Sequence, residues 1–403
     1  MPLPNRLLQA LHPRLQYLSG NRIALLCNGA EYFPALLNAI NCAHESVRLE
    51  TYIYANDAVG KACTEALCRA AARGVDVRLV VDGFGARNLD QHHRPQLEAA
   101  GVQIGIFRPE HQLLRHVIGF KRTRLRRMHR KVALIDGRRA FVGGINIIDD
   151  TTGNKGNVRF DFALDIEGPL IEPIAQAVDR QWLTLNRLSR MLHDTQPTPA
   201  RTRLHIASIG HLEAALALRD NLMNRRVIEQ SYLRAIRQAH DHISLAMAYF
   251  IPSRRILAEL LAAAQRGVQV SLLLQGRVEY RLQHYASQAL YDTLLKHGVR
   301  IFLYHPGFMH AKVAVIDDTW STLGSANLDP FSLLVAREAN IVIRNTVFAQ
   351  TLLAQLRQAI HLHSKEITMD TWVTQPAHHR LLRNISAQLL YRVLRLTGYA
   401  DNY

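Results

Sequence analysis

The sequence predicts an α/β protein made of two copies of one βα unit. Helical and short apolar stretches alternate along both halves of the chain, as they do in proteins whose sheets are covered by helices. Three pairs of segments recur in the same order, and a His-x-Lys-x₄-Asp motif closes each copy. We therefore expect two duplicated halves, each with a mixed, mostly parallel sheet covered by helices.

The first half contains the elements of one such unit. Apolar residues at helical spacing predict helices at 31–45, 61–73 and 95–100. Alternating or continuous apolar residues predict strands at 46–53, 75–81 and 102–107. Gly74 and Gly101 follow the last two helices, where a glycine commonly ends a helix.

The second half repeats these elements in the same order. AHDHISLAMAYF (239–250) parallels AHESVRLETYIY (43–54), AQRGVQVSLLLQG (264–276) parallels AARGVDVRLVVDG (71–83), and HGVRIFLYHP (297–306) parallels AGVQIGIFRP (100–109). Such a repeat indicates duplication of one structural unit.

Two further segments repeat each other and carry candidate site residues. In each, an Asn lies 17 residues after a His, behind a glycine and a second small residue. The matching residues are His129, Lys131, Asp136, Gly143, Gly144 and Asn146 in the first segment, and His310, Lys312, Asp317, Gly324, Ser325 and Asn327 in the second. A His and a Lys two residues apart on a strand lie on the same face, so we expect the two side chains of each pair to act together.

The pairs suit substitution at a phosphodiester. That reaction needs a nucleophile, a proton donor for the leaving oxygen and stabilisation of negative charge. One neutral imidazole would attack phosphorus, and the other, protonated, would serve first as acid and then as base. Lys131 and Lys312 would hold the non-bridging oxygens, with further hydrogen bonds from Asn146 and Asn327, so this set needs no metal.

The composition calls for an anionic partner. The net charge is +16, which suits nucleic acid, an acidic membrane surface or a phosphate-bearing substrate. The four cysteines have no zinc-like spacing and indicate free thiols in a reducing compartment; they are Cys27, Cys42, Cys63 and Cys68. The amino terminus lacks a signal peptide, and no apolar run reaches the length of a spanning helix. Any membrane contact is therefore expected to be peripheral.

Four parts are expected along the chain. Residues 1–192 form the first half, 193–205 a linker with two prolines, 206–365 the second half and 366–403 a basic amphipathic tail. The segment 110–128, which only the first half has, joins an apolar cluster to a basic run. This segment, the tail and the arm at 1–20 suit either the interface of an anionic membrane or packing and surface roles in the protein.

The two motifs resemble those of the phospholipase D superfamily and, within it, bacterial cardiolipin synthases of the B type. Stretches in both halves carry the resemblance, among them LETYIY, RGVDVRLVVDGFG, RRMHRKVALIDGRRAFVGGIN, HAKVAVIDD, LGSANLDP and REANIVI. It implies that the active site lies at the interface between the halves and that phosphohistidine forms without a cofactor. It also implies that Asp136 and Asp317 support the motifs structurally and that Asp161 and Glu338 orient the histidines.

The implied reaction moves a phosphatidyl group from one phosphatidylglycerol to another and releases glycerol. The expected partners are this anionic phospholipid and the inner membrane surface, with the enzyme peripheral on the cytoplasmic face. A hydrolase acting on phospholipid or nucleic acid is the alternative, although few aromatic residues are present for base stacking. A basic membrane-binding scaffold without activity is a third. The motifs leave open which histidine attacks, whether phosphatidylethanolamine is a donor, and the oligomeric state.

Overall fold

The computed structural model describes residues 15–87, 89–109, 126–149, 159–190, 202–221, 224–374 and 376–396. The chain divides into two compact units. The N-terminal unit runs from Tyr17 to Leu216, apart from a short segment that ends at Asp161. The C-terminal unit includes that segment and the chain from Ala217 onward, so Asp161 belongs with the second half of the sequence.

The N-terminal unit is built on a sheet in the order β8-β1-β7-β6-β5-β2-β3-β4. β2 is parallel to β3 and β3 to β4, whereas β2 pairs antiparallel with β5, and the pairs β5-β6, β6-β7, β7-β1 and β1-β8 are also antiparallel. The strands are β1 (Leu18–Cys27), β2 (Ser46–Thr51), β3 (Asp76–Asp82), β4 (Gln103–Phe107), β5 (Val132–Ile135), β6 (Arg139–Gly143), β7 (Phe162–Glu167) and β8 (Leu212–Arg219).

The C-terminal unit repeats this pattern in the order β15-β11-β10-β9-β12-β13-β14. β9, β10 and β11 pair in parallel as β2, β3 and β4 do, and β12, β13 and β14 correspond to β5, β6 and β7. The strands are β9 (His242–Met247), β10 (Gln269–Gln275), β11 (Arg300–Tyr304), β12 (Lys312–Ile316), β13 (Trp320–Gly324), β14 (Glu338–Arg344) and β15 (Ser364–Ile367).

The mixed α/β class and the duplication are confirmed, but the expectation that the sheets are mostly parallel is wrong. Antiparallel pairs outnumber parallel pairs in the N-terminal unit, and in the C-terminal unit β9-β12, β12-β13, β13-β14 and β11-β15 are antiparallel. The reason lies in the motifs themselves, because a turn of three residues joins β5 to β6. A connection that short permits only an antiparallel hairpin.

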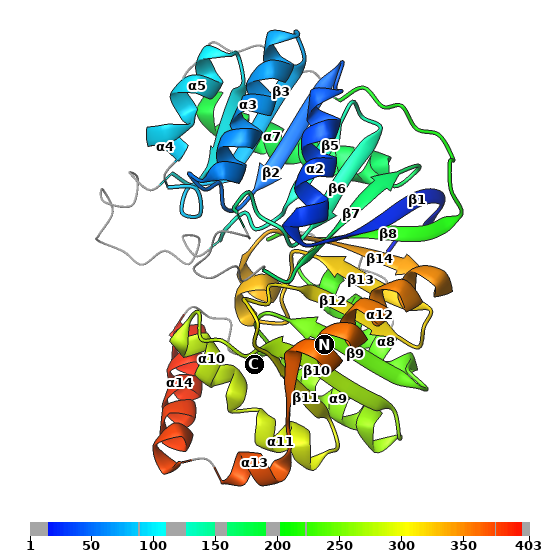
Figure 1. Ribbon diagram of the computed structural model, residues 1–403, viewed down its shortest axis with the longest axis vertical. Helices are drawn as coiled ribbons and strands as arrows, with labels where there is room; N and C mark the ends of the chain where they lie inside the picture. The colour runs from blue at the N-terminus through cyan, green and yellow to red at the C-terminus, as the bar shows by residue number, and fades with distance from the viewer. Residues whose placement is uncertain are drawn as a thin grey trace, which may run out of the picture. The chain divides into compact units, whose positions relative to one another are not determined.

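Helices pack on these sheets (Figure 1). In the N-terminal unit α2 packs on α3, and α7 contacts β4, β5 and β6. In the C-terminal unit α9 contacts β10, α12 contacts β9 and β11–β15, and α10 packs on α14. The helices are α2 (Asn28–Asn41), α3 (Ala58–Ala72), α4 (Leu89–His92), α5 (Arg94–Ala99), α7 (Ile171–Arg190), α8 (Val227–Gln238), α9 (Arg254–Gln265), α10 (Arg281–Gln288), α11 (Tyr291–Lys296), α12 (Thr346–His363), α13 (Met369–Val373) and α14 (Ala377–Leu396), with a π-helix η2 (Phe331–Val335).

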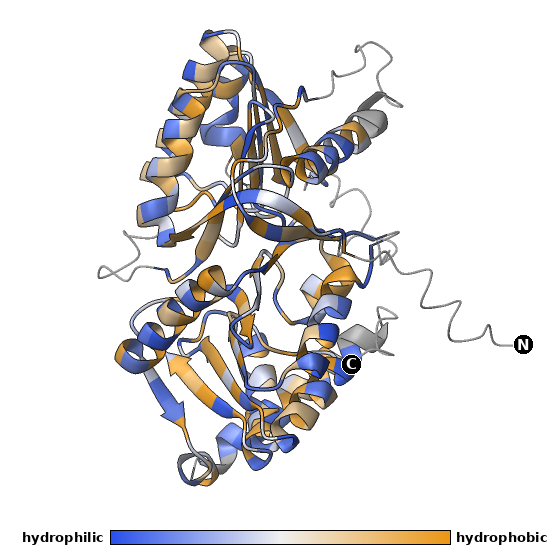
Figure 2. Cartoon of the chain, turned by 90° about the vertical axis from the view of Figure 1, so that its right-hand side faces the viewer, coloured by the Kyte–Doolittle hydropathy of each residue, from blue (hydrophilic) through white to orange (hydrophobic). Residues whose placement is uncertain are grey.

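Burial of both faces explains the continuous apolar runs in the strands. On β3, Leu79 and Val81 belong to the large core that also contains residues of α2 and α3. Val80, which points to the opposite face, packs in a second cluster with Trp182 of α7. Figure 2 shows the strands mostly as hydrophobic, while the helices display both hydrophobic and hydrophilic residues.

Some elements differ from the sequence expectation. The strand β1 is not predicted, because Leu18 falls at helical spacing from Leu7, Leu8, Leu11 and Leu15. β1 is held by its antiparallel pairing with β7, a partner about 140 residues away that local spacing does not reveal. Residues 1–14, 110–125 and 191–201 lie outside the described residues, and so do most of the expected arm, insertion and linker. The expected tail starts within β15.

Candidate functional site

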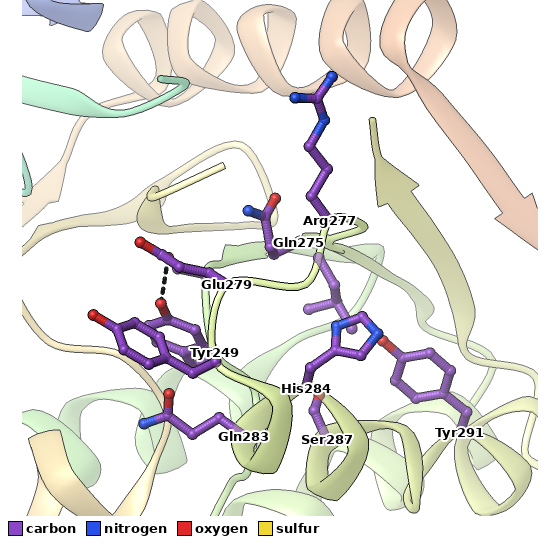
Figure 3. A pocket seen from close by; sticks show the side chains of 11 residues that line it. Tyr249, Gln275, Arg277, Glu279, Gln283, His284, Ser287 and Tyr291 are labelled. Atoms are coloured by element: carbon purple, nitrogen blue, oxygen red, sulfur yellow. Dashed lines mark hydrogen bonds between the residues drawn. The ribbon is translucent and has the colours of Figure 1, made fainter. Parts of the chain in front are cut away.

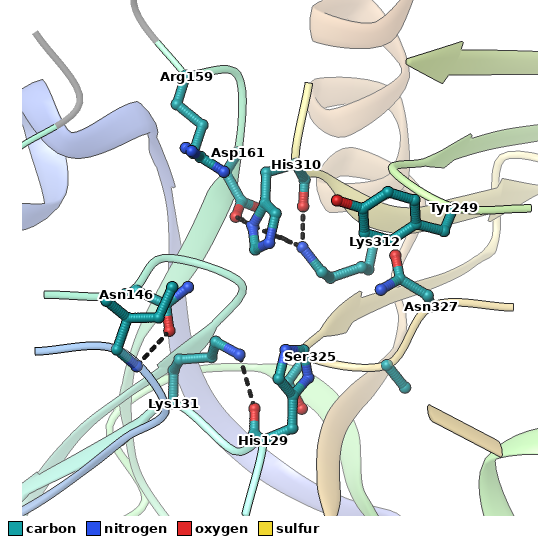
Figure 4. Close-up of polar contacts among 12 residues, drawn as sticks. His129, Lys131, Asn146, Arg159, Asp161, Tyr249, His310, Lys312, Ser325 and Asn327 are labelled. Carbon is teal, nitrogen blue, oxygen red and sulfur yellow. Dashed lines mark hydrogen bonds and ion pairs between the residues drawn. The ribbon is translucent and has the colours of Figure 1, made fainter. Parts of the chain in front are cut away.

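The first motif places a histidine and a lysine together at the start of β5. The Lys131 ammonium donates a hydrogen bond of 2.8 Å to the carbonyl oxygen of His129 (Figure 4). The His129 ring lies edge-on to the ring of Tyr52, with 5.0 Å between the centroids. Lys131 is buried, at 3% exposure. The ammonium is thus fixed beside its own histidine.

The second motif has the same local geometry at the start of β12. The Lys312 ammonium donates to the carbonyl oxygen of His310 and lies 2.7 Å from its Nδ1. The His310 backbone N–H donates to the carbonyl oxygen of Phe160 at 2.8 Å, so the segment ending at Asp161 runs beside the motif. In both motifs the lysine ammonium reaches the backbone carbonyl of its own histidine, and in the second it also reaches the ring; that the two side chains act together stays a prediction.

Asp161 is the partner of the second histidine. Its Oδ2 lies 2.6 Å from Nδ1 of His310, and the carboxylate is 1% exposed (Figure 4). A carboxylate is a stronger acceptor than an imidazole nitrogen, so we assign the tautomer in which Nδ1 carries the proton and donates it to Asp161. Nε2 of His310 is then the nitrogen that is free to give up and take back a proton. In the sequence Asp161 follows the first motif and is matched with it. In the structure its carboxylate contacts the histidine of the second motif.

Burial and nearby charges determine the charge state of Lys312. The side chain is fully buried, and burial lowers its pKa to about 8. The carboxylate of Asp161, 3.8 Å from the ammonium, acts in the opposite direction, as do Glu338 and Glu279, while Arg159 lowers the pKa further. The lysine therefore loses its charge within a pH range that an activity assay can reach.

Each motif aspartate accepts backbone hydrogen bonds at the end of the strand that lies away from the histidine. The Asp136 carboxylate accepts three backbone N–H bonds of 2.8–2.9 Å, from residues 44–46. Asp317 accepts the corresponding bonds from residues 240–242 at 2.8–3.0 Å. At about 3.3 Å per residue, the strand puts roughly 20 Å between each aspartate and its histidine. We therefore assign a structural role to these aspartates. Each ties its hairpin turn to the chain at the start of the neighbouring strand, β2 or β9.

The motif asparagines lie in equivalent turns but have different contacts. Asn146 Oδ1 accepts the backbone N–H of Ile53 at 3.1 Å, which leaves its amide N–H groups as the donors of this side chain. Oδ1 of Asn327 is buried and accepts no hydrogen bond from the residues that the structure describes. Both side chains are 4% exposed. Their proposed contact with substrate oxygens remains a prediction.

The small residues beside the asparagines are engaged with the next strand. The N–H of Gly144 donates to the carbonyl oxygen of Phe162 at 2.9 Å. The Ser325 hydroxyl donates to the Glu338 carboxylate and accepts the N–H of Ala339 at 3.0 Å. Ser325 thus holds β14; its role in substrate binding and the orientation of a histidine by Glu338 stay predictions.

The backbone before each histidine is held by a residue that the sequence analysis does not identify. Asp82, at the end of β3, accepts the N–H of Met128 at 2.9 Å. Gln275, at the end of β10, accepts the N–H of Met309 at 2.9 Å. They occupy matching places in the repeated segments, immediately before Gly83 and Gly276. Alignment of the two repeats was the signal that could have identified them.

The fold and the paired motifs define a class of protein with two phospholipase D-like halves. The family model described as "Cardiolipin synthase, PLD-like domain" matches residues 36–182 and 232–360. The structure of phosphatidylserine synthase from Haemophilus influenzae has a TM-score of 0.68 over 99% of this chain and 98% of that chain. At 13% sequence identity, that likeness concerns the fold alone.

Proteins similar in sequence identify the family within this class. "Cardiolipin synthase B" of Escherichia coli K12 is 36% identical over 364 residues, which cover 88% of this chain and 84% of that protein. "Cardiolipin synthase A" of Pseudomonas putida F1 is 32% identical over 382 residues, 93% of this chain and 76% of that protein. The chain belongs to the cardiolipin synthase family of phospholipase D-like proteins.

The charge of Lys312 predicts the alkaline side of the pH profile. The ammonium is charged below pH 8 and neutral above, so phosphodiester turnover should fall as pH rises through about 8. Asp161→Asn removes a charge that favours the ammonium, so the fall should move to lower pH and turnover should drop about 10²-fold. A pH series with a chromogenic phosphodiester measures both.

Two variants control this experiment. Lys312→Arg keeps the positive charge at every pH tested, so the alkaline fall should disappear from its remaining activity. Asp292→Asn, at a side chain on α11 that is 50% exposed, should behave as the wild type. An unchanged alkaline fall in Lys312→Arg, with the melting temperature preserved, would contradict the assignment to Lys312.

Proposed function

We propose that this chain transfers a phosphatidyl group from one phosphatidylglycerol to the terminal hydroxyl of another and releases glycerol, which makes it a cardiolipin synthase. One observation carries the proposal. Both motifs of a chain 36% identical to a "Cardiolipin synthase B" place a buried ammonium against the histidine of the same motif. The reaction needs an imidazole beside a fixed cation, because the group in transfer is anionic.

The proposed reaction has two balanced steps. A neutral imidazole attacks the donor phosphorus, the P–N bond forms and the P–O bond to the glycerol head group breaks, while the second imidazole protonates the leaving oxygen. That second imidazole then takes the proton from the terminal hydroxyl of the acceptor. The acceptor oxygen attacks phosphorus, and the P–N bond breaks. We assign His129 as the nucleophile and His310 as the acid and base.

The two steps require both histidines at one phosphorus. We propose that the motifs of the two halves act on a single phosphate. The duplication supports this, because each half supplies one imidazole and one ammonium, and neither half alone has the complete set. Lys131 and Lys312 stabilise the non-bridging oxygens, where a metal ion would otherwise act.

Transfer competes with hydrolysis at the second step. The phosphohistidine reacts with whichever hydroxyl the second imidazole can deprotonate, water or the acceptor lipid. A hydrolase would release phosphatidic acid by the same chemistry. Products therefore distinguish the two functions where the motifs do not.

Product identification tests the proposed function. Purified protein incubated with phosphatidylglycerol vesicles should yield a four-chain diphosphatidyl lipid and free glycerol by mass spectrometry. A chelator should leave the rate unchanged, because lysines supply the positive charge. His129→Ala and His310→Ala should each lower the rate by at least 10²-fold.

Other products would contradict the proposal in different ways. Phosphatidic acid as the main lipid product would identify a hydrolase. Cleavage of DNA without any lipid product would identify a nuclease. Vesicle binding with no turnover, unchanged in both histidine variants, would indicate a scaffold. Phosphatidylethanolamine in the vesicles tests a second donor.

We further propose that the chain acts as a peripheral protein at the inner membrane surface, with α14 as one contact. α14 packs on α10, and Arg383 lies over the ring of Trp372. The side of α14 that faces away from α10 exposes an apolar stripe about 100° wide. The stripe consists of Leu381, Leu382, Ile385 and Leu389, which are 42–61% exposed. Among the described residues no helix is both long and apolar enough to cross a membrane.

The charge of α14 favours an anionic lipid surface as its partner. Residues 377–396 include arginines and no acidic residue. An exposed apolar stripe beside positive charge is typical of helices that lie in the membrane interface. Phosphatidylglycerol supplies both the acyl chains and the negative charge.

A double variant tests the stripe. Ile385→Glu with Leu389→Glu should weaken sedimentation with phosphatidylglycerol vesicles by about tenfold or more, because two apolar side chains no longer enter the interface. Val347→Glu on α12, where the valine is 70% exposed, is the matched control and should bind as the wild type. Equal binding of the double variant and the wild type would exclude α14 as a membrane contact.

A further inference from the structure

The second motif is accompanied by a cation that the mechanism above does not use. Arg159 lies two residues before Asp161, on the segment that runs beside the motif in the C-terminal unit (Figure 4). The N–H of Phe160 donates to the carbonyl oxygen of Phe308 at 2.9 Å, and the N–H of His310 donates to that of Phe160 at 2.8 Å. Residues two apart on an extended segment share a face, so Arg159 lies on the face that Asp161 presents to His310.

The side chains on this face meet in two pairs. Oδ2 of Asp161 lies 2.6 Å from Nδ1 of His310, and the Arg159 guanidinium lies over the Phe308 ring, 5.6 Å from its centroid. The two pairs are two residues apart along the segment, which is roughly 7 Å. Arg159 is also close enough to Lys312 to lower the pKa of that ammonium. The arginine is therefore a neighbour of the acid and base.

The guanidinium of Arg159 is accessible to a ligand. Its side chain is 22% exposed, whereas that of Lys312 is fully buried. Among the described residues its ion pair is with Glu279, and the 3.8 Å between the two groups is too long for a hydrogen bond. The other oxygen of Glu279 accepts the hydroxyl of Tyr249 (Figure 3). A guanidinium has five N–H donors and binds phosphate through two of them in parallel.

The two halves of the chain differ at this position. The pairing of β6 with β7 and of β13 with β14 makes Asp161 equivalent to Glu338. Arg159 is then equivalent to Ala336, a buried residue without charge. The arginine thus belongs to the segment that serves His310, the histidine assigned as acid and base.

The proposed reaction brings a second phosphate to His310 in its second step. The alcohol that leaves in the first step is free glycerol, whereas the acceptor that attacks in the second carries a phosphate of its own. That phosphate is five bonds from the terminal hydroxyl, and five bonds span roughly 6 Å. The span is close to the step of roughly 7 Å between Asp161 and Arg159. An acceptor whose hydroxyl lies at His310 can therefore place its phosphate at Arg159.

We infer that Arg159 binds the phosphate of the acceptor phosphatidylglycerol while His310 takes the proton from its terminal hydroxyl. The inference rests on the proposed function and names the residue that selects its acceptor. The contact adds affinity to a lipid that the membrane already holds. Water and neutral alcohols have no phosphate, so the contact favours transfer to an anionic lipid over hydrolysis.

The test offers two acceptors in one membrane. Vesicles contain phosphatidylglycerol and monoacylglycerol, which presents the same pair of hydroxyl groups without a phosphate. Transfer to phosphatidylglycerol gives a four-chain lipid and transfer to monoacylglycerol a three-chain lipid, and mass spectrometry measures both. Both acceptors compete for the same phosphohistidine, so the ratio of the two products does not depend on the donor step.

Arg159→Gln should lower the ratio of four-chain to three-chain lipid by about tenfold or more, because one acceptor alone loses a charge-assisted contact. The rate of three-chain lipid formation should not fall. Phosphatidic acid, the product with water, should rise relative to the four-chain lipid in the same way. The assay is run at pH 7, where the Lys312 ammonium is charged in both proteins, since its pKa is about 8 and loss of Arg159 raises it.

Two further variants make the comparison specific. Arg255→Gln makes the same chemical change at an exposed position of α9 and should leave the product ratios unchanged. Arg159→Met also removes the charge and is read in the same way if Arg159→Gln does not fold. Melting curves and sedimentation with the vesicles establish that each variant is folded and bound.

The outcomes separate this inference from the function on which it rests. Wild-type protein that forms no four-chain lipid refutes the function, and the role of Arg159 fails with it. Wild-type protein that forms four-chain lipid, with unchanged product ratios in Arg159→Gln, refutes the role of Arg159 alone. An equal fall in the products of all acceptors also refutes it, because Arg159 would then serve the donor or the fold.

Discussion

The hydrogen bond between Asp161 and His310 sets the chemistry of the C-terminal unit. Asp161 is almost fully buried, so its charge is stabilised by the imidazole and by the Lys312 ammonium rather than by water. In return it keeps the proton on Nδ1, leaves Nε2 reactive and favours the charged form of a lysine that burial would otherwise neutralise. Without this carboxylate both the histidine and its cation lose the state that phosphoryl chemistry requires.

Each motif separates reactive and supporting residues along one strand. The histidine and lysine lie at the beginning, whereas Asp136 and Asp317 hold three backbone N–H groups at the other end. Asp82 and Gln275 hold the chain just before each histidine. The backbone that carries each histidine is thus held by contacts to neighbouring strands, and a fixed backbone limits where the imidazole can lie.

The sequence predicted the duplication, the main elements and the positions of both motifs, because repeats and local spacing record these directly. It missed β1, which depends on pairing with the distant β7, and it overestimated parallel pairing. For the site, it identified Asp161 but could not assign it to His310, 149 residues away. Gln275 belongs to no motif, and only its place in the repeat, equivalent to that of Asp82, indicates that it holds the backbone before His310.

The central claim is that His129 and His310 act on one phosphorus. Calorimetric titration with tungstate, a tetrahedral oxyanion resembling phosphate, tests it most directly. The account predicts one tungstate per chain and loss of binding in both His129→Ala and His310→Ala, with the folded state preserved. Two independent oxyanions per chain, or full affinity in either single variant, would contradict it.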